Sequence, residues 1–222
     1  MSVLFVDALG TLLALSDPAP RLSAELDRRF GVAVSEAQAR DAIAAEISYY
    51  RAHFDEGRDP ASLADLRGRC AETLRSRLPA DGRLPEVSTE ELTEALLAAL
   101  HFSAFEDAQP ALERARDRWE RVIVVSNWDV SLVEVLGRVG LAPLVDAVVT
   151  SASVGVRKPG VAIFEHALAL AGAQAAEAVH VGDGVEDDVA GARAAGIEPV
   201  LIRRDGGAGP PGVRTITTLA AL

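Results

Sequence analysis

Short runs of apolar residues, each followed at once by polar side chains, constrain the fold of this chain more than any other feature. Asp7 follows the run at 3–6, Ser126 follows the run at 121–125, and a Gly-Asp pair follows the run at 178–181. Apolar runs without alternation are typical of strands buried on both faces of a parallel sheet. Because helical patterns separate these runs, we predict an α/β fold with right-handed crossovers.

The same alternation continues through the second half of the chain. We predict further strands at 147–150 and 199–202, and helices at 111–119 and 160–171. Two more helices are predicted, one that follows Asp129 and runs to about 138 and one that follows Gly184 and runs to 195. The glycine- and proline-rich stretch 205–212 is predicted to be a flexible loop.

Residues from about 20 to about 101 show helical patterns and no convincing strand. Two capping boxes, Ser35 with Gln38 and Ser88 with Glu91, mark helix starts in this block. We predict about four helices here, inserted into the α/β domain between its first and second strands. The predicted domains are therefore a Rossmann-like core formed by 1–16 and 104–222 and an all-helical cap at 17–103, which can open and close over the sheet edge.

Composition argues against several classes of protein. The net charge of −11 argues against general nucleic-acid binding, which needs a basic surface. No stretch reaches the roughly 18 consecutive apolar residues of a membrane helix, and no basic signal-like segment is expected at the N-terminus. The single cysteine, Cys70, forms no internal disulfide. We expect a cytoplasmic protein, monomeric or homodimeric, without nucleic-acid or membrane partners.

Four groups of polar residues follow the predicted strands or a strand-to-helix connection. In a parallel sheet the carboxyl ends of the strands lie at one edge, where ligands bind in such folds. We therefore expect the four groups to converge on one cleft. They are Asp7, Ser126 with Asn127, Lys158, and Asp183 with Asp187 and Asp188.

Carboxylates that converge in this way repel one another unless a cation lies between them. Oxygen ligands suit Mg²⁺, which binds to one or two carboxylates together with phosphate oxygens and water. We predict Asp7 and Asp183 as direct ligands, and Asp188 as a third ligand or as a group behind the ligands. Ser126 and Asn127 are predicted to hold the oxygens of a bound anion.

Lys158 is the only lysine among 22 basic residues, and Asn127 is the only asparagine. Because the chain otherwise uses arginine, this lysine indicates a position where a compact point charge is required. We predict that it neutralises a carboxylate nucleophile and a bound anion. Simpler roles remain open: Ser126 as a helix N-cap, Asp188 as an acid in a first helical turn, and Thr11 as a turn residue.

Four motifs in this order span essentially the whole chain. They are Asp7-x-x-Gly10-Thr11, Ser126-Asn127, Lys158-Pro159 and Gly182-Asp183-x₄-Asp188. Together they resemble the haloacid dehalogenase (HAD) superfamily, and the helical insertion resembles its C1-type cap. The resemblance implies a nucleophilic Asp7 and a covalent aspartyl intermediate, which in most members is an aspartyl phosphate formed with Mg²⁺. It also implies that Lys158 orients the nucleophile, that Thr11, Ser126 and Asn127 contact the phosphate, and that Asp183 and Asp188 serve the metal.

One position departs from the phosphatase pattern. In phosphatases of this superfamily the residue two after the nucleophile is usually a second aspartate, which protonates the leaving alcohol and then activates water. Here it is Leu9, which transfers no proton, although its backbone carbonyl remains a candidate metal ligand. Loss of a positioned acid–base group costs about 10²–10⁴ in rate, or roughly 3–5 kcal/mol of barrier. Acyl and aryl phosphates, whose leaving groups need least protonation, are therefore the predicted substrates.

The dehalogenases of the superfamily are an alternative. They are similar to this chain in an Asp-Ala-x-Gly-Thr-Leu first motif, since a leaving halide needs no proton. The fourth motif favours the phosphatases, because dehalogenases use no metal and lack its Gly-Asp pair. A metal-free pocket has little use for so much negative charge beside a nucleophile. We therefore predict a Mg²⁺-dependent, phosphatase-type hydrolase acting on a small phosphorylated metabolite. The alternatives are a metal-independent 2-haloacid dehalogenase and a non-catalytic protein that binds Mg²⁺ and phosphate.

Overall fold

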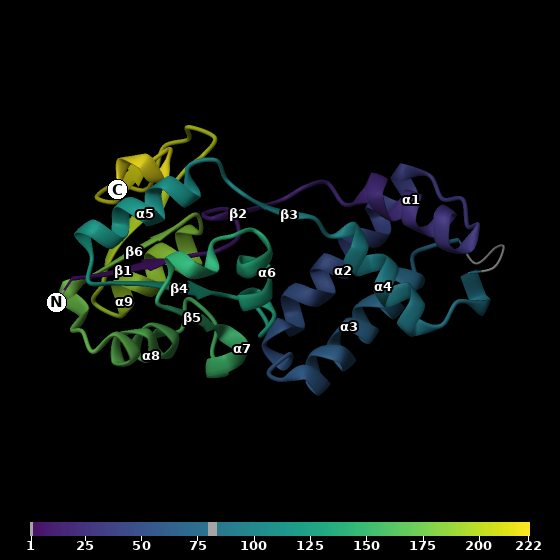
Figure 1. Ribbon diagram of the computed structural model, residues 1–222, viewed down its shortest axis with the longest axis horizontal. Helices are drawn as coiled ribbons and strands as arrows, with labels where there is room; N and C mark the ends of the chain where they lie inside the picture. Colours follow the sequence, from purple (N-terminus) through teal and green to yellow (C-terminus); the bar gives the residue numbers. More distant parts are fainter. Residues whose placement is uncertain (1, 80–83) are drawn as a thin grey trace. The chain divides into compact units, whose positions relative to one another are not determined.

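A computed structural model describes residues 2–79 and 84–222 of the chain (Figure 1). The chain divides into two compact units, one formed by Met1–Ala14 with Ser103–Leu222 and the other by Leu15–Phe102. The sequence places the corresponding boundaries at 16–17 and 103–104. That the helical unit acts as a C1-type cap stays a prediction.

The first unit contains a six-stranded sheet with helices around it (Figure 1). Its strands are β1 (Val3–Val6), β4 (Arg121–Ser126), β5 (Ala147–Thr150), β6 (Ala178–Gly182), β7 (Glu198–Ile202) and β8 (Arg214–Ile216). Its α-helices are α5 (Ala108–Arg118), α6 (Leu132–Arg138), α7 (Ser151–Val154), α8 (Val161–Ala171) and α9 (Gly191–Ala194). A π-helical turn covers Val185–Ala190, and short 3₁₀ turns cover Ala142–Leu144, Ala175–Glu177 and Leu219–Ala221.

The strand order is β5-β4-β1-β6-β7-β8, and the neighbouring strands run parallel. In chain order this is the 3-2-1-4-5-6 arrangement of the Rossmann fold, so the predicted α/β class is confirmed. β1 lies at the point where the order reverses, between β4 and β6. Val6 is level with Val124 of β4 and Val181 of β6, so the residues that follow these three strands lie at the same edge of the sheet.

Helices cover both faces of this sheet. On one face Phe164 and Ile163 of α8 pack against Phe5 and neighbouring strand residues, all of them fully buried. α5 packs on β4 from the other side of the strands (Figure 1). Each such buried apolar side chain contributes roughly 1.5–3 kcal/mol, which makes the sheet a rigid support for its edge.

The second unit is helical among its described residues. It consists of α1 (Ala19–Phe30), α2 (Glu36–His53), α3 (Pro60–Arg75) and α4 (Thr89–Ala99), with 3₁₀ turns at Phe54–Glu56 and Leu84–Glu86. Both predicted capping boxes are present, Ser35 with Gln38 at α2 and Ser88 with Glu91 at α4. The apolar faces of the four helices meet in one core, in which Leu66 is fully buried.

Two short strands and one helical feature were not predicted from the sequence. β2 (Leu13–Leu15) pairs with β3 (Phe102–Ala104), where the chain passes between the two units. These strands are too short to show an alternating pattern. The helix predicted after Gly184 begins as the π-helical turn Val185–Ala190. No helix in the described ranges combines the length and the apolar character needed to cross a membrane.

Candidate active site

Asp7 follows β1 and receives two hydrogen bonds on one carboxylate oxygen. Ser126 Oγ, at the end of β4, donates to Asp7 Oδ1 over 2.9 Å, and Lys158 Nζ donates to the same oxygen over 2.6 Å. The Asp7 backbone N–H donates to the Val181 carbonyl of β6 over 2.9 Å. Within the described part of the chain, no donor reaches Oδ2. The carboxylate is therefore held in one orientation with one oxygen available to a ligand.

Lys158 lies in the connection between α7 and α8, and only 2% of its surface is exposed. Its ammonium donates to Asp7 Oδ1 and Asp188 Oδ1, each over 2.6 Å, and to the Val125 carbonyl over 2.9 Å. These bonds use all three donors of the ammonium group. Burial by itself lowers the pKa of Lys158, but the negative charges of Asp188 and Asp7 outweigh this effect and raise it. The lone lysine is therefore a buried cation that joins two acids.

Asn127 holds the backbone of Lys158. Its side-chain Oδ1 accepts a hydrogen bond from the Lys158 N–H over 2.7 Å, and its Nδ2 donates to the Lys158 carbonyl over 3.0 Å. The Lys158–Pro159 peptide bond that follows is cis. Because both ends of the amide contact Lys158, the structure gives this side chain a positioning role. Its predicted contact with phosphate stays a prediction.

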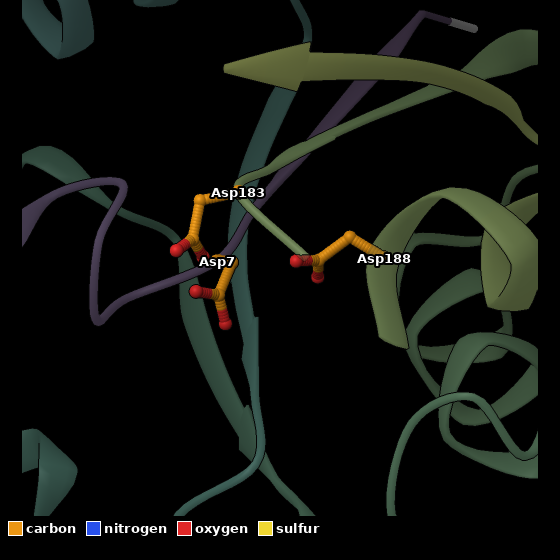
Figure 2. A group of neighbouring side chains, drawn as sticks. All are labelled: Asp7, Asp183 and Asp188. Carbon is orange, nitrogen blue, oxygen red and sulfur yellow. The ribbon is translucent and has the colours of Figure 1, made fainter. Parts of the chain in front are cut away.

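Asp188 is buried in the π-helical turn, with its carboxylate directed back toward the strand ends (Figure 2). Its Oδ1 lies 2.8 Å from His180 Nε2 and also accepts from Lys158, and its Oδ2 accepts from the Gly184 N–H over 2.8 Å. A Cβ atom at Gly182 would lie 2.1 Å from the Asp188 Cγ, so only glycine fits there. Asp188 thus orients Lys158, and its predicted direct contact with a metal stays a prediction.

Asp183 is exposed at the end of β6 and faces Asp7 (Figure 2). A Cβ atom at Gly10, whose φ is +84°, would lie 2.2 Å from Asp183 Oδ2, so the turn after β1 packs directly on this carboxylate. Oxygen atoms of Asp7, Asp183 and Asp188 all lie within 4.8 Å of one another. The structure therefore brings together the three acids that the sequence singles out.

Burial and mutual repulsion set the charges of these acids. Burial raises the pKa of Asp7 to about 6, with Lys158 opposing the rise and Asp188 adding to it. Burial and the charge of Asp188 also raise the pKa of Asp183. The pKa of Asp188 lies well below its usual range, because Lys158 and His180 outweigh the effect of burial. Carboxylates that lie this close together and have raised pKa values repel each other, so an added cation is favoured at this site.

The chemistry of the donor set fits a hard divalent cation. Three carboxylates share one edge of the sheet, and Lys158 already contacts two of them. Carboxylate oxygens at such distances suit Mg²⁺. Asp188 already accepts hydrogen bonds on both oxygens, so Asp7 and Asp183 would be the residues to hold such an ion, and this assignment stays a prediction.

Two predicted site residues lie in the turn after β1. The Thr11 hydroxyl is buried and finds no hydrogen-bond partner among the described residues, while its carbonyl accepts from Arg204. Leu9 is half-buried and carries no ionisable group. The predicted phosphate contact of Thr11 and the predicted metal contact of the Leu9 carbonyl stay predictions.

Comparison with known proteins assigns the chain to a family. The model of the haloacid dehalogenase-like hydrolases matches residues 1–196. The chain belongs to this family. The HAD resemblance inferred from the four motifs is therefore confirmed, and family membership makes this chain a hydrolase.

Individual relatives agree with this assignment. The chain is 30% identical over 211 residues to the haloacid dehalogenase-like hydrolase domain-containing protein 3 of Mus musculus, covering 91% of this chain and 82% of that protein. It is 38% identical over 96 residues to the ribulose-1,5-bisphosphate 5-phosphatase of Halopiger xanaduensis, which covers 43% of this chain. The chain spans 40% of the length of that phosphatase, and 45% of the length of the Bos taurus form of the domain-containing protein.

A solved structure of similar fold is that of a HAD phosphatase from Thermococcus onnurineus. It is 26% identical, with a TM-score of 0.66 over 99% of this HAD-family chain and 95% of that one. This likeness supports the HAD fold over the full length of the chain.

Two residues of this HAD site carried no clear signal in the sequence. His180, interpreted from the sequence as structural, is fully buried against Asp188. A histidine inside an apolar buried strand was the one indication of a polar partner. Arg204 contacts the turn after β1, and nothing in its sequence context distinguishes it from the many other arginines.

Proposed function

We propose that this HAD-family hydrolase is a Mg²⁺-dependent phosphatase that uses Asp7 as its nucleophile. The observation that carries the proposal is the Asp7 carboxylate, held on Oδ1 by Ser126 and Lys158 beside the exposed Asp183. Relatives named as phosphatases, such as a glyceraldehyde 3-phosphate phosphatase of Methanopyrus kandleri, support a small phosphorylated metabolite as the substrate.

The first step is transfer of a phosphoryl group to Asp7. One carboxylate oxygen of Asp7 attacks phosphorus, the bond from phosphorus to the leaving oxygen breaks, and the electron pair departs with that oxygen. Ser126 and Lys158 fix the attacking carboxylate in line, which lowers the entropic part of the barrier. Bound Mg²⁺ would neutralise the charge of the phosphate and of the acids around it. Lys158 keeps its charge because Asp188 and Asp7 raise its pKa.

The second step is hydrolysis of the aspartyl phosphate. Water attacks phosphorus, the bond from phosphorus to Asp7 breaks and its electron pair stays with the carboxylate, and both protons of the water remain on the released dihydrogen phosphate. A carboxylate is a good leaving group and needs no proton.

Leu9 determines which substrates react well. It lies two residues after the nucleophile, where phosphatases of this family usually have a second acid. The leaving oxygen therefore departs without a proton from the protein, which favours acyl and aryl phosphates over alkyl phosphates. The difference is roughly 3–5 kcal/mol of barrier, the usual contribution of a positioned acid.

A panel assay tests this proposal. Phosphate release is measured from acetyl phosphate, p-nitrophenyl phosphate and an alkyl phosphate, with Mg²⁺ and with a chelator, for the wild type and for Asp7→Asn. We expect Mg²⁺-dependent turnover of the first two substrates and none in the variant. Turnover of the alkyl phosphate alone would contradict the role given to Leu9. Turnover without Asp7 would contradict the proposed nucleophile.

Leu9 also favours a second candidate, a 2-haloacid dehalogenase, because halide departs without a proton. A solved structure titled 2-haloacid dehalogenase, from Pseudomonas syringae, shares the fold at 24% identity. Chelator-resistant chloride release from 2-chloropropionate would support this candidate. A protein that binds Mg²⁺ and phosphate without turnover would release neither phosphate nor chloride in the panel.

A further inference from the structure

Arg204 lies just after β7 and donates to the turn that follows β1. Its Nε donates to the Gly10 carbonyl over 3.3 Å, and its Nη2 donates to the Thr11 carbonyl over 2.6 Å. These two carbonyls belong to the first motif, directly after Leu9. The arginine is therefore attached to the backbone that carries the proposed nucleophile and not to any carboxylate of the site.

The other side of the guanidinium is held by Asp107, at the start of α5. Nη1 donates to Asp107 Oδ2 over 3.1 Å and Nη2 donates to Oδ1 over 2.9 Å. Asp107 Oδ2 also accepts from Thr218 Oγ1 over 2.6 Å and from the Leu219 N–H over 2.8 Å. A two-point ion pair with a fixed carboxylate gives the guanidinium a defined orientation.

Phe105 completes this arrangement. The Arg204 Cζ lies 3.7 Å from the centre of the Phe105 ring, and the Phe105 N–H donates to the Leu12 carbonyl over 3.0 Å. A planar guanidinium with five donors is the side chain that can stack on a ring, pair with a carboxylate and reach two carbonyls at once. Lysine has one nitrogen and cannot make this set of contacts.

The turn that Arg204 holds also packs on Asp183. Gly10 has a φ of +84°, and a Cβ atom there would lie 2.2 Å from Asp183 Oδ2. The turn is closed by bonds from the N–H groups of Leu12 and Leu13 to the Ala8 carbonyl, each over 2.8 Å. A shift of this turn therefore moves Asp7 and Asp183 relative to each other.

We infer that Arg204 is a positioning residue of the active site. Its guanidinium fixes the carbonyls of Gly10 and Thr11, so that the turn bearing Asp7 and Leu9 stays against Asp183. The metal-binding readout below rests on the proposed function, whereas the hydrogen-exchange readout does not.

Two variants with the same chemical change at neighbouring positions test the inference. Arg204→Lys removes the planar guanidinium and keeps the positive charge. Arg203→Lys is the matched control, because Arg203 contributes only a partly exposed pair with Asp205. Hydrogen exchange is followed in metal-free protein at the amides of Leu12 and Leu13, relative to the amides of β5. We expect these turn amides to exchange at least about tenfold faster in Arg204→Lys, and at the wild-type rate in the control.

Mg²⁺ affinity, measured by titration calorimetry, is the second readout. Mutation of residues that hold metal ligands in place typically weakens metal binding 10–100-fold, and we expect about tenfold weaker Mg²⁺ binding for Arg204→Lys. If the role of Arg204 were purely structural, Arg204→Lys would lower the stability of the protein to urea without a selective change in the hydrogen exchange of the turn amides or in Mg²⁺ affinity. That result would overturn the inference. Absence of Mg²⁺ binding in the wild type would contradict the proposed function, and the exchange comparison would still decide on Arg204.

A second variant covers the case in which Arg204→Lys does not fold. Asp107→Asn weakens the ion pair while it keeps the shape of the side chain, and we expect roughly threefold faster exchange at Leu12 and Leu13. Wild-type exchange in this folded variant, with wild-type Mg²⁺ affinity, would refute the inference.

Discussion

Replacement of Lys158 by methionine removes a cation that contacts both Asp7 and Asp188. Methionine has a similar length and no charge, so the change leaves two buried carboxylates without their shared donor. Breaking a buried ion pair by removal of one partner typically costs 3–5 kcal/mol. We expect a loss of unfolding free energy in this range at pH 7.5.

The ordinary pKa of aspartate gives an independent magnitude. The variant can relieve the repulsion by protonating one carboxyl. At pH 7.5, about 3.7 units above the ordinary aspartate pKa of 3.8, this costs about 5 kcal/mol at 1.36 kcal/mol per unit. The cost is an upper limit on the destabilisation, and it agrees with the range above.

The loss of unfolding free energy in Lys158→Met should be smaller at lower pH. A carboxyl whose pKa in the folded state is raised above the unfolded value stabilises the fold below the unfolded pKa, and this contribution disappears as pH rises through the folded pKa. Between pH 7.5 and pH 5.5 the variant should regain about 2.7 kcal/mol. The wild type regains about 0.8 kcal/mol over the same interval, because the pKa of Asp7 is about 6. The difference between the two proteins should therefore fall by roughly 2 kcal/mol.

Urea unfolding of both proteins in a chelator, at pH 5.5 and pH 7.5, measures this difference. Arg203→Met is the control, since it removes the same charge from a partly exposed pair and should cost at most about 1 kcal/mol. A loss for Lys158→Met below about 1 kcal/mol at pH 7.5, or a loss that grows as the pH falls, would refute the account of this site.

Three further substitutions test separate parts of the structure. Burial raises the pKa of Glu46 from 4.5 to about 7, so the free energy of unfolding should fall by roughly 3 kcal/mol as pH rises from 4.5 through 7. Glu46→Gln should abolish this pH dependence in urea unfolding. An unchanged pH dependence would refute the raised pKa of Glu46. Gly10→Ala should cost about 1 kcal/mol more than Gly155→Ala, which has a similar positive φ but open space around its Cβ. The backbone strain is common to both variants, so the difference reports the contact with the exposed Asp183 side chain, and equal losses would contradict the packing on Asp183. Leu9→Asp should raise turnover of alkyl phosphates at least about tenfold, and a folded variant without this gain would count against the role of Leu9.

The sheet and its edge were predictable because strand patterns and strand ends are local in the sequence. The run 147–150 was predicted with the bounds that the structure shows for β5, and the run 3–6 matches β1. A parallel sheet places the ends of its strands together, so the proximity of Asp7 and Asp183 followed from topology alone. The isolated lysine pointed to a compact charge, and Lys158 is the buried cation of the site.

The roles of the side chains that hold the acids and Lys158 in place were not predictable from the sequence. His180 contacts Asp188 only because a π-helical turn carries the acid back to the strand. The sequence did not indicate that the Asn127 amide holds the backbone of Lys158, whereas its predicted contact with an anion stays a prediction. Arg204 reaches a turn almost 200 residues earlier in the chain. Such contacts depend on three-dimensional packing between distant segments, which spacing and composition do not encode.

Trapping of the covalent intermediate tests the central claim most directly. The protein is mixed with acetyl phosphate and Mg²⁺, quenched during turnover and reduced with borohydride, which converts an acyl phosphate of aspartate to homoserine. Peptide mass spectrometry then reads the residue at position 7. We expect homoserine at position 7, only with substrate and Mg²⁺, and no conversion of Asp183 or Asp188. Unmodified Asp7 in a sample that releases phosphate would contradict the claim that Asp7 is the nucleophile.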